Sequence, residues 1–142
     1  MIVPDANLLI YAYDKGSGPH AEARRWWEKT LSGPEPVGVP NVVILAFIRL
    51  MTHPTLSGNP LATDEATQFV QSWLAQSHCR VLPSSATTVA LFFDLLKQSG
   101  VGGNLTTDTW IAASALEYGG RVYSNDRDFD RFPSLTWVNP LE

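Results

Sequence analysis

Short apolar runs alternate with longer segments of helical spacing along the chain, and this alternation limits the fold more than any other feature. Five runs read as strands, at 2–3, 37–39, 80–82, 121–124 and 135–138. Apolar residues recur with helical spacing over 6–13, 20–31, 42–52, 66–74, 89–99 and 108–118. Strands that alternate with helices are typical of a parallel sheet covered on both faces. The sequence therefore predicts an α/β fold, an α/β/α sandwich of about five short strands with helices on both faces.

Size and composition predict one domain in a reducing compartment. A chain of 142 residues buries about 68–70% of its unfolded surface without a disulfide. Cys79 is the only cysteine, and the start of the chain has neither a basic lead nor an apolar span long enough for export or insertion. We expect a single domain over residues 1–142, in the cytoplasm and away from membranes. A net charge of −4 argues against general nucleic-acid affinity.

Three aspartates stand where a parallel sheet brings side chains together. Asp5 ends the first apolar run, Asp108 opens the helix before the fourth run, and Asp126 follows that run. Ligands of open parallel sheets bind outside the carboxyl ends of the strands. Each aspartate alone is more often a cap, and Asp126 and Asp128 have a turn-capping interpretation that is as good as the metal one. The joint placement predicts a carboxylate cluster.

Such a cluster requires a cation and suits one kind of chemistry. Carboxylates that crowd together repel one another unless positive charge compensates them. Oxygen ligands favour a hard ion, so we expect Mg²⁺, with Mn²⁺ as the alternative. A metal held in this way can activate water for phosphodiester hydrolysis. The chain lacks the glycine-rich phosphate loops, the HExxH motif and the cysteine and histidine spacing that other cofactors need.

Three segments carry the strongest signal in the chain: MIVPDANLL at 1–9, NLTTDTWIAA at 104–113 and SNDRDF at 124–129. Together they resemble the segments of PIN-domain ribonucleases, and in particular those of the VapC toxins of toxin–antitoxin pairs. The resemblance implies a PIN-like fold, a Mg²⁺-dependent endoribonuclease activity on an RNA substrate, inhibition by a cognate antitoxin, and a homodimer. Carried over by position, Asp5, Asp108 and Asp126 are the catalytic and metal-binding acids. Asp128 supplies either an outer-shell carboxylate or a fourth metal-binding one, and Asn7 supports Asp5.

The chain departs from the family pattern in the third helix. The family usually has Glu three residues before an Arg, and the segment ILAFIR at 44–49 places Ala46 before Arg49. The missing acid favours an alternative function, a PIN-like module that binds RNA or protein without cleaving. A phosphatase with Asp5 as nucleophile is a third hypothesis, but its general acid would stand at Asn7, which has no proton to donate.

Adjacent tryptophans in the second helix predict a partner surface. Neighbouring residues on a helix point to different faces, so we expect one of Trp26 and Trp27 in the core and the other at an interface. Such a surface suits an amphipathic segment of an antitoxin. The candidate phosphate contacts are Arg24, Arg25, Arg49 and Arg127, although exposed ion pairs are the expected role for at least half of them.

Overall fold

The computed structural model describes residues 1–100 and 102–142. Its strands are β1 (Ile2–Pro4), β2 (Val37–Pro40), β3 (Cys79–Leu82), β4 (Arg121–Tyr123) and β5 (Trp137–Val138). Its α-helices are α1 (Ala6–Tyr13), α2 (His20–Ser32), α3 (Asn41–Thr52), α4 (Thr63–Leu74), α5 (Ala86–Ser99) and α6 (Thr106–Tyr118). Two short 3₁₀ helices are η1 (Gly103–Leu105) and η2 (Arg127–Arg131). The strands form one parallel sheet in the order β3-β2-β1-β4-β5.

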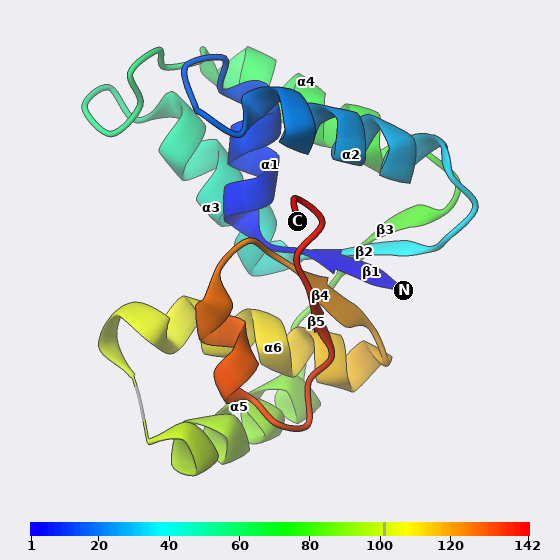
Figure 1. Cartoon of the computed structure of the whole chain (residues 1–142), viewed down its shortest axis with the longest axis vertical. Helices are drawn as coiled ribbons and strands as arrows, with labels where there is room; N and C mark the ends of the chain where they lie inside the picture. Colours follow the sequence, from blue (N-terminus) through cyan, green and yellow to red (C-terminus); the bar gives the residue numbers. More distant parts are fainter. Residues whose placement is uncertain (101) are drawn as a thin grey trace.

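The sheet lies between two groups of helices (Figure 1). Helices α1 to α4 lie on one side of it, and α5 and α6 lie on the other. This arrangement confirms the predicted α/β/α sandwich. In the part of the chain that the structure describes, no helix is long and apolar enough to cross a membrane.

Large aromatic side chains fill the core on the side of α1 to α4. The Trp73 ring meets the edges of Trp27 and Phe47, with ring centroids 5.5 and 4.8 Å apart. On the other side, the buried face of α6 is mostly small, with Ala112, Ala113 and Ala115. Small side chains let a helix approach a sheet closely, so the residues at the start of α6 are brought to the ends of β1 and β4.

Several element boundaries differ from the sequence prediction. Helix α6 begins at Thr106, so Asp108 lies in its first turn and does not open it. Helix α5 begins three residues earlier than predicted, at Ala86, because the Ser85 hydroxyl accepts hydrogen bonds from the backbone N–H groups of Thr87 and Thr88. The last strand is shorter than predicted and contains only Trp137 and Val138.

The strand order reverses direction beside β1. From β1 the chain runs outward through β2 and β3, and then crosses to β4 and β5 on the other side of β1. In open parallel sheets, ligands bind where the order reverses in this way, at the carboxyl ends of the strands. The residues that follow β1 and β4 therefore line the expected site.

Candidate metal centre

The register of β1 and β4 places Asp5 beside Ser124. Pro4 is opposite Tyr123 in this parallel pair, so the next residue of each strand leaves the sheet at the same point. The Asp5 backbone N–H donates to the Tyr123 carbonyl at 2.9 Å. The Ser124 hydroxyl donates to the Asp5 carboxylate (Oγ to Oδ2) at 2.8 Å. Asp5 is only 3% exposed and Ser124 is fully buried, so the pair forms the floor of the site.

Ser124 also connects Asp5 to Asp126, a role that was not predicted. Its Oγ atom accepts a hydrogen bond from the Asp126 backbone N–H at 3.0 Å. One hydroxyl thus positions the carboxylate of Asp5 and the backbone that carries Asp126. The available signal was a small hydroxyl residue at the end of a strand, two positions before an aspartate.

Three carboxylates converge above this floor. One carboxylate oxygen each from Asp108, Asp126 and Asp128 lies within 4.8 Å of the other two. Asp108 reaches the group from the first turn of α6, and the other two come from the start of η2. Asp5 is not a member of this compact group and lies beneath it, close enough for its charge to act on Asp108. The structure thus brings the four predicted site residues to one place.

The turn that holds Asp126 and Asp128 combines two roles. The Asp126 carboxylate accepts from the Asp128 backbone N–H at 2.9 Å and caps η2. The Asp128 carboxylate accepts from the Arg131 guanidinium at 3.2 Å. The capping interpretation is therefore correct for Asp126, and it is compatible with the cluster because a carboxylate has a second oxygen.

Charge crowding perturbs two of the acids. Burial raises the pKa of Asp5 to about 6, and the negative charge of Asp126 adds to the effect, while the Ser124 hydrogen bond opposes it. Burial also raises the pKa of Asp108 to about 7, together with the charges of Asp5, Asp126 and Asp128. The Asp108 carboxylate has no hydrogen bond or ion pair within the part of the chain described. An acid in this state binds either a proton or a cation.

The donor set fits a hard divalent ion. Mg²⁺ binds oxygen at about 2.0–2.1 Å in octahedral geometry, so its ligands are about 3 Å apart when adjacent and about 4 Å apart when on opposite sides. The oxygens of Asp108, Asp126 and Asp128 lie within 4.8 Å of one another, and they would move closer together around an ion. No thiol or imidazole belongs to the group, which favours Mg²⁺ or Mn²⁺ over softer metals.

Ala46 lines a cavity of about 490 Å³ between α3 and the start of α6. The cavity is formed by Val42, Leu45, Ala46, Arg49, Thr106, Thr107 and Trp110. Position 46 thus shares this cavity with the two residues that precede Asp108, and its alanine side chain contributes no carboxylate to it.

The other residues predicted to support Asp5 or to contact phosphate lie in different environments. The Asn7 side chain is exposed, and only its backbone favours the charged form of Asp5. Arg24 pairs with Glu28 on the same helix at 2.8 Å, which is the expected alternative role. Arg25, Arg49 and Arg127 are exposed, and none of them has an ion pair among residues 1–100 and 102–142.

The two adjacent tryptophans divide as their positions predict. Trp27 is 1% exposed and packs in the core. Trp26 is half-buried and stacks on Tyr123, with ring centroids 5.8 Å apart and planes inclined by 17°. It lines two surface cavities of about 410 and 390 Å³.

Comparison with known proteins defines the class of this fold and site. The family model of the PIN domain matches residues 2–135. Ribonuclease VapC33 of Mycobacterium tuberculosis is 36% identical over 141 residues, which cover 99% of both chains. Among solved structures, VapBC2 from Rickettsia felis, bound to a DNA fragment from its promoter, has a TM-score of 0.71 at 19% identity and covers 98% of both chains.

A second structural neighbour is VapC20 of Mycobacterium tuberculosis, a toxin that cleaves the sarcin-ricin loop. It has a TM-score of 0.69 at 19% identity, with 92% of this chain and 93% of that chain covered. The chain belongs to the PIN domain family and, within it, groups with the VapC proteins. The resemblance carried by the three sequence segments is thus confirmed.

Proposed function

We propose that this protein is a Mg²⁺-dependent endoribonuclease and the toxin of a type II toxin–antitoxin pair. The observation that carries the proposal is the convergence of Asp5, Asp108, Asp126 and Asp128 at one sheet edge, with the half-buried Asp108 lacking any cationic partner within the described chain. The VapC relatives support it, because they are named ribonucleases. A non-cleaving module, the alternative raised by Ala46, gains no support from them.

The chain's own residues define the roles in this proposal. Asp108, Asp126 and Asp128 would bind the ion directly. The Asp5 carboxylate beneath them would add a further negative charge that helps to neutralise the ion. When bound, the ion supplies the charge that activates water and offsets charge on the phosphate and leaving oxygen. Ser124 keeps Asp5 and Asp126 oriented through its two hydrogen bonds. Arg49, exposed on α3 beside the start of α6, would bind an RNA phosphate.

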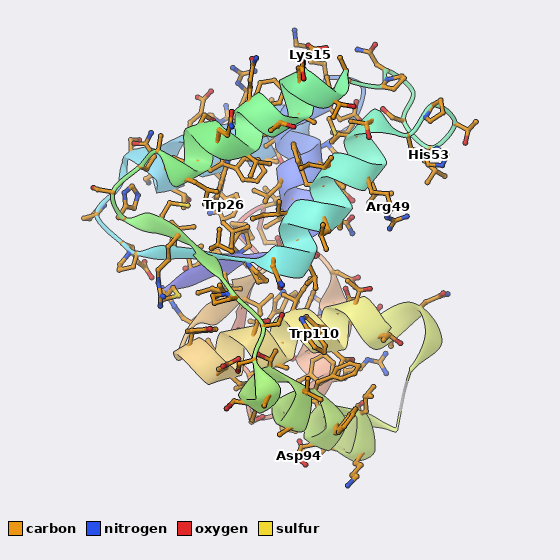
Figure 2. All side chains as sticks on the ribbon, turned by 180° about the vertical axis from the view of Figure 1, so that it is seen from behind. Lys15, Trp26, Arg49, His53, Asp94 and Trp110 are labelled. Carbon is orange, nitrogen blue, oxygen red and sulfur yellow. The ribbon has the colours of Figure 1, made fainter. Side chains whose placement is uncertain are left out.

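Single substitutions in the cluster test the assignment. Asp5→Asn or Asp108→Asn removes one negative charge with little change of shape, and we expect each to abolish cleavage of RNA by the purified, partner-free chain in Mg²⁺. Asp94→Asn is the matched control, because Asp94 is exposed on α5 (Figure 2). Folding is checked by circular dichroism. Wild-type cleavage by a folded Asp5 or Asp108 variant would remove that residue from the site.

An antitoxin is the proposed protein partner. The structural neighbours include VapBC complexes, and Trp26 on α2 offers an aromatic anchor that lines two surface cavities. An amphipathic segment can bury such an anchor. We expect the product of the adjacent reading frame to copurify with the chain after co-expression, and Trp26→Ala to weaken the complex at least tenfold in a binding titration. Undiminished affinity would exclude Trp26 from the interface.

We also propose that residues 1–142 form one PIN-like domain, that the protein acts in the cytoplasm, and that two copies associate as a homodimer. The exposed apolar pair Val89 and Phe93 on α5 offers a surface that a second copy would cover. Light scattering coupled to chromatography tests the dimer, for which the mass should be twice the 15.6 kDa of one chain.

A further inference from the structure

The cavity between α3 and α6 has the size and composition of a small-ligand site. Its volume of about 490 Å³ lies within the range of about 300–1,000 Å³ that is usual for such sites. Apolar side chains form most of its lining, with Val42, Leu45 and Ala46 from α3 and Trp110 from α6. Figure 2 shows Arg49 and Trp110 on these two neighbouring helices.

One wall is a fixed aromatic ring. Trp110 packs against Phe92 with ring centroids 5.0 Å apart and planes inclined by 64°. Phe92 on α5 therefore restrains the indole. Aromatic side chains of this kind stack with unstacked nucleobases in single-stranded RNA. The cavity thus offers a flat, apolar surface to a flat ligand.

Polar groups stand at the same cavity without partners. The hydroxyls of Thr106 and Thr107 form no hydrogen bond with other residues in the described part of the chain. The Arg49 guanidinium, which also lines the cavity, is exposed and has no ion pair there. Hydroxyl groups can donate to and accept from the edge of a base, and a guanidinium binds phosphate oxygens with two parallel hydrogen bonds.

The cavity and the metal centre share the first turn of α6. Thr106 and Thr107 line the cavity and directly precede Asp108, which belongs to the carboxylate group. On the other wall, the small side chain of Ala46 occupies little of the space. A ligand in the cavity would therefore contact the helical turn that carries Asp108.

We propose that this cavity binds a single unstacked nucleobase of the RNA, next to the phosphodiester that is cleaved, with Arg49 on the adjoining phosphate. The inference rests on the proposed ribonuclease function and adds a determinant of cleavage specificity to it. Thr106 and Thr107 contact the edge of the base, and Trp110 contacts its face. A base held in this way fixes which bond lies over the carboxylates.

The first test compares two variants that add the same atoms at different places. Ala46→Leu fills the cavity, whereas Ala21→Leu adds a leucine to the exposed surface of α2. RNA ends produced in Mg²⁺ are mapped by sequencing. We expect the wild type and Ala21→Leu to share one base preference beside the cut, and Ala46→Leu to lose it and to cleave at least tenfold more slowly. Thr107→Val, which removes only a hydroxyl, should change the preference without affecting the fold.

A second test does not depend on cleavage. The four ribonucleoside 5′-monophosphates are titrated into the full chain, and backbone amide signals are followed by NMR. We expect shifts at Ala46, Thr106 and Thr107 that persist in Asp108→Asn and disappear in Ala46→Leu. If the wild type binds nucleotides there but cuts no RNA, the proposed function fails while the base site stands.

Two results would overturn the base site. One is an unchanged cleavage preference together with unchanged nucleotide shifts in Ala46→Leu. The other is a change from dimer to monomer in that variant, measured by light scattering, with no nucleotide shifts in the wild type. Leu45, which is 67% exposed at the rim of the cavity, would then be a contact to a second copy of the chain.

Discussion

Ser124 is the residue that joins the floor of the site to its upper carboxylates. Ser124→Ala removes the hydrogen bond to Asp5 and leaves the Asp126 N–H without its acceptor. We expect a loss of about 1–3 kcal/mol in the free energy of unfolding, measured by urea denaturation, together with weaker Mg²⁺ binding. Ser114→Ala is the control, because the Ser114 hydroxyl donates only to a carbonyl of its own helix. Equal losses in both variants would contradict the linking role.

Ala46 is the position at which an added charge should change metal binding. Ala46→Glu adds a carboxylate to the cavity that the first turn of α6 lines, so the Mg²⁺ concentration for half-maximal cleavage should fall, while the filled cavity should lower the maximal rate as in Ala46→Leu. Without metal, the same change adds repulsion and should lower the melting temperature. Mg²⁺ titrations of both forms, followed by cleavage and by thermal melting, measure the two effects. A metal dependence identical to that of the wild type would mean that position 46 does not face the ion, or that Asp128 already fills the role.

The raised pKa values of two acids predict how stability depends on pH. In the metal-free chain the pKa is about 7 for Asp108 and about 6 for Asp5, against 3.8 for an ordinary aspartate. The folded chain therefore binds these protons more tightly than the unfolded chain. The resulting stabilisation is complete below pH 3.8 and is lost as the pH rises through 6 and 7.

Thermal melting between pH 5 and 8 measures this effect. We expect the metal-free melting temperature to fall over that range, and Mg²⁺ to raise it most at pH 8, where the carboxylates are charged. Asp108→Asn should flatten the decline, whereas Asp94→Asn should not. A decline of the same size in Asp108→Asn would show that another group causes it.

At the scale of elements, helix α2 has one tryptophan for the core and one for the surface. Trp27→Ala removes a buried side chain that packs on Trp73, and we expect it to cost about 3–5 kcal/mol of unfolding free energy. Trp26→Ala should cost clearly less, because that ring is half-buried. Guanidinium denaturation of both variants measures the difference. Similar losses would contradict the division of the helix into a core face and a partner face.

The helices and strands were predictable because the spacing of hydrophobic residues marks them. The residues at which they begin and end were harder to predict. The periodicity in α4 marks residues 66 to 74, and the sequence favours Thr63 or Asp64 as the cap, but the helix begins at Thr63 itself, where the Glu65 side chain accepts from the Ala62 N–H. Helix η2 falls inside a segment predicted as a loop, because the Asp126 cap organises it. Such side-chain hydrogen bonds compete with one another locally, and spacing alone does not select among them.

At the scale of the whole molecule, the strand order determines which residues meet at the site, and the sequence alone does not predict that order. Alternating strands and helices predicted a parallel sheet and a carboxylate cluster at its carboxyl edge, but not that β1 and β4 are neighbours. That adjacency gives Ser124 its role. The cavity shared by Ala46 and Thr106 likewise joins helices that are about sixty residues apart. Long-range packing, rather than any local pattern, creates both features.

Cleavage of a labelled RNA by the purified, partner-free chain tests the central claim most directly. One preparation is assayed as purified with Mg²⁺, after chelation, and after Mg²⁺ is restored, with Asp108→Asn beside it at each step. We predict cleavage in Mg²⁺, none in the chelator, recovery on restoring the ion, and no cleavage by the variant at any step. Cleavage that persists in the chelator, or that the Asp108→Asn protein performs equally well, would contradict the assignment of this carboxylate cluster as a metal-dependent ribonuclease site.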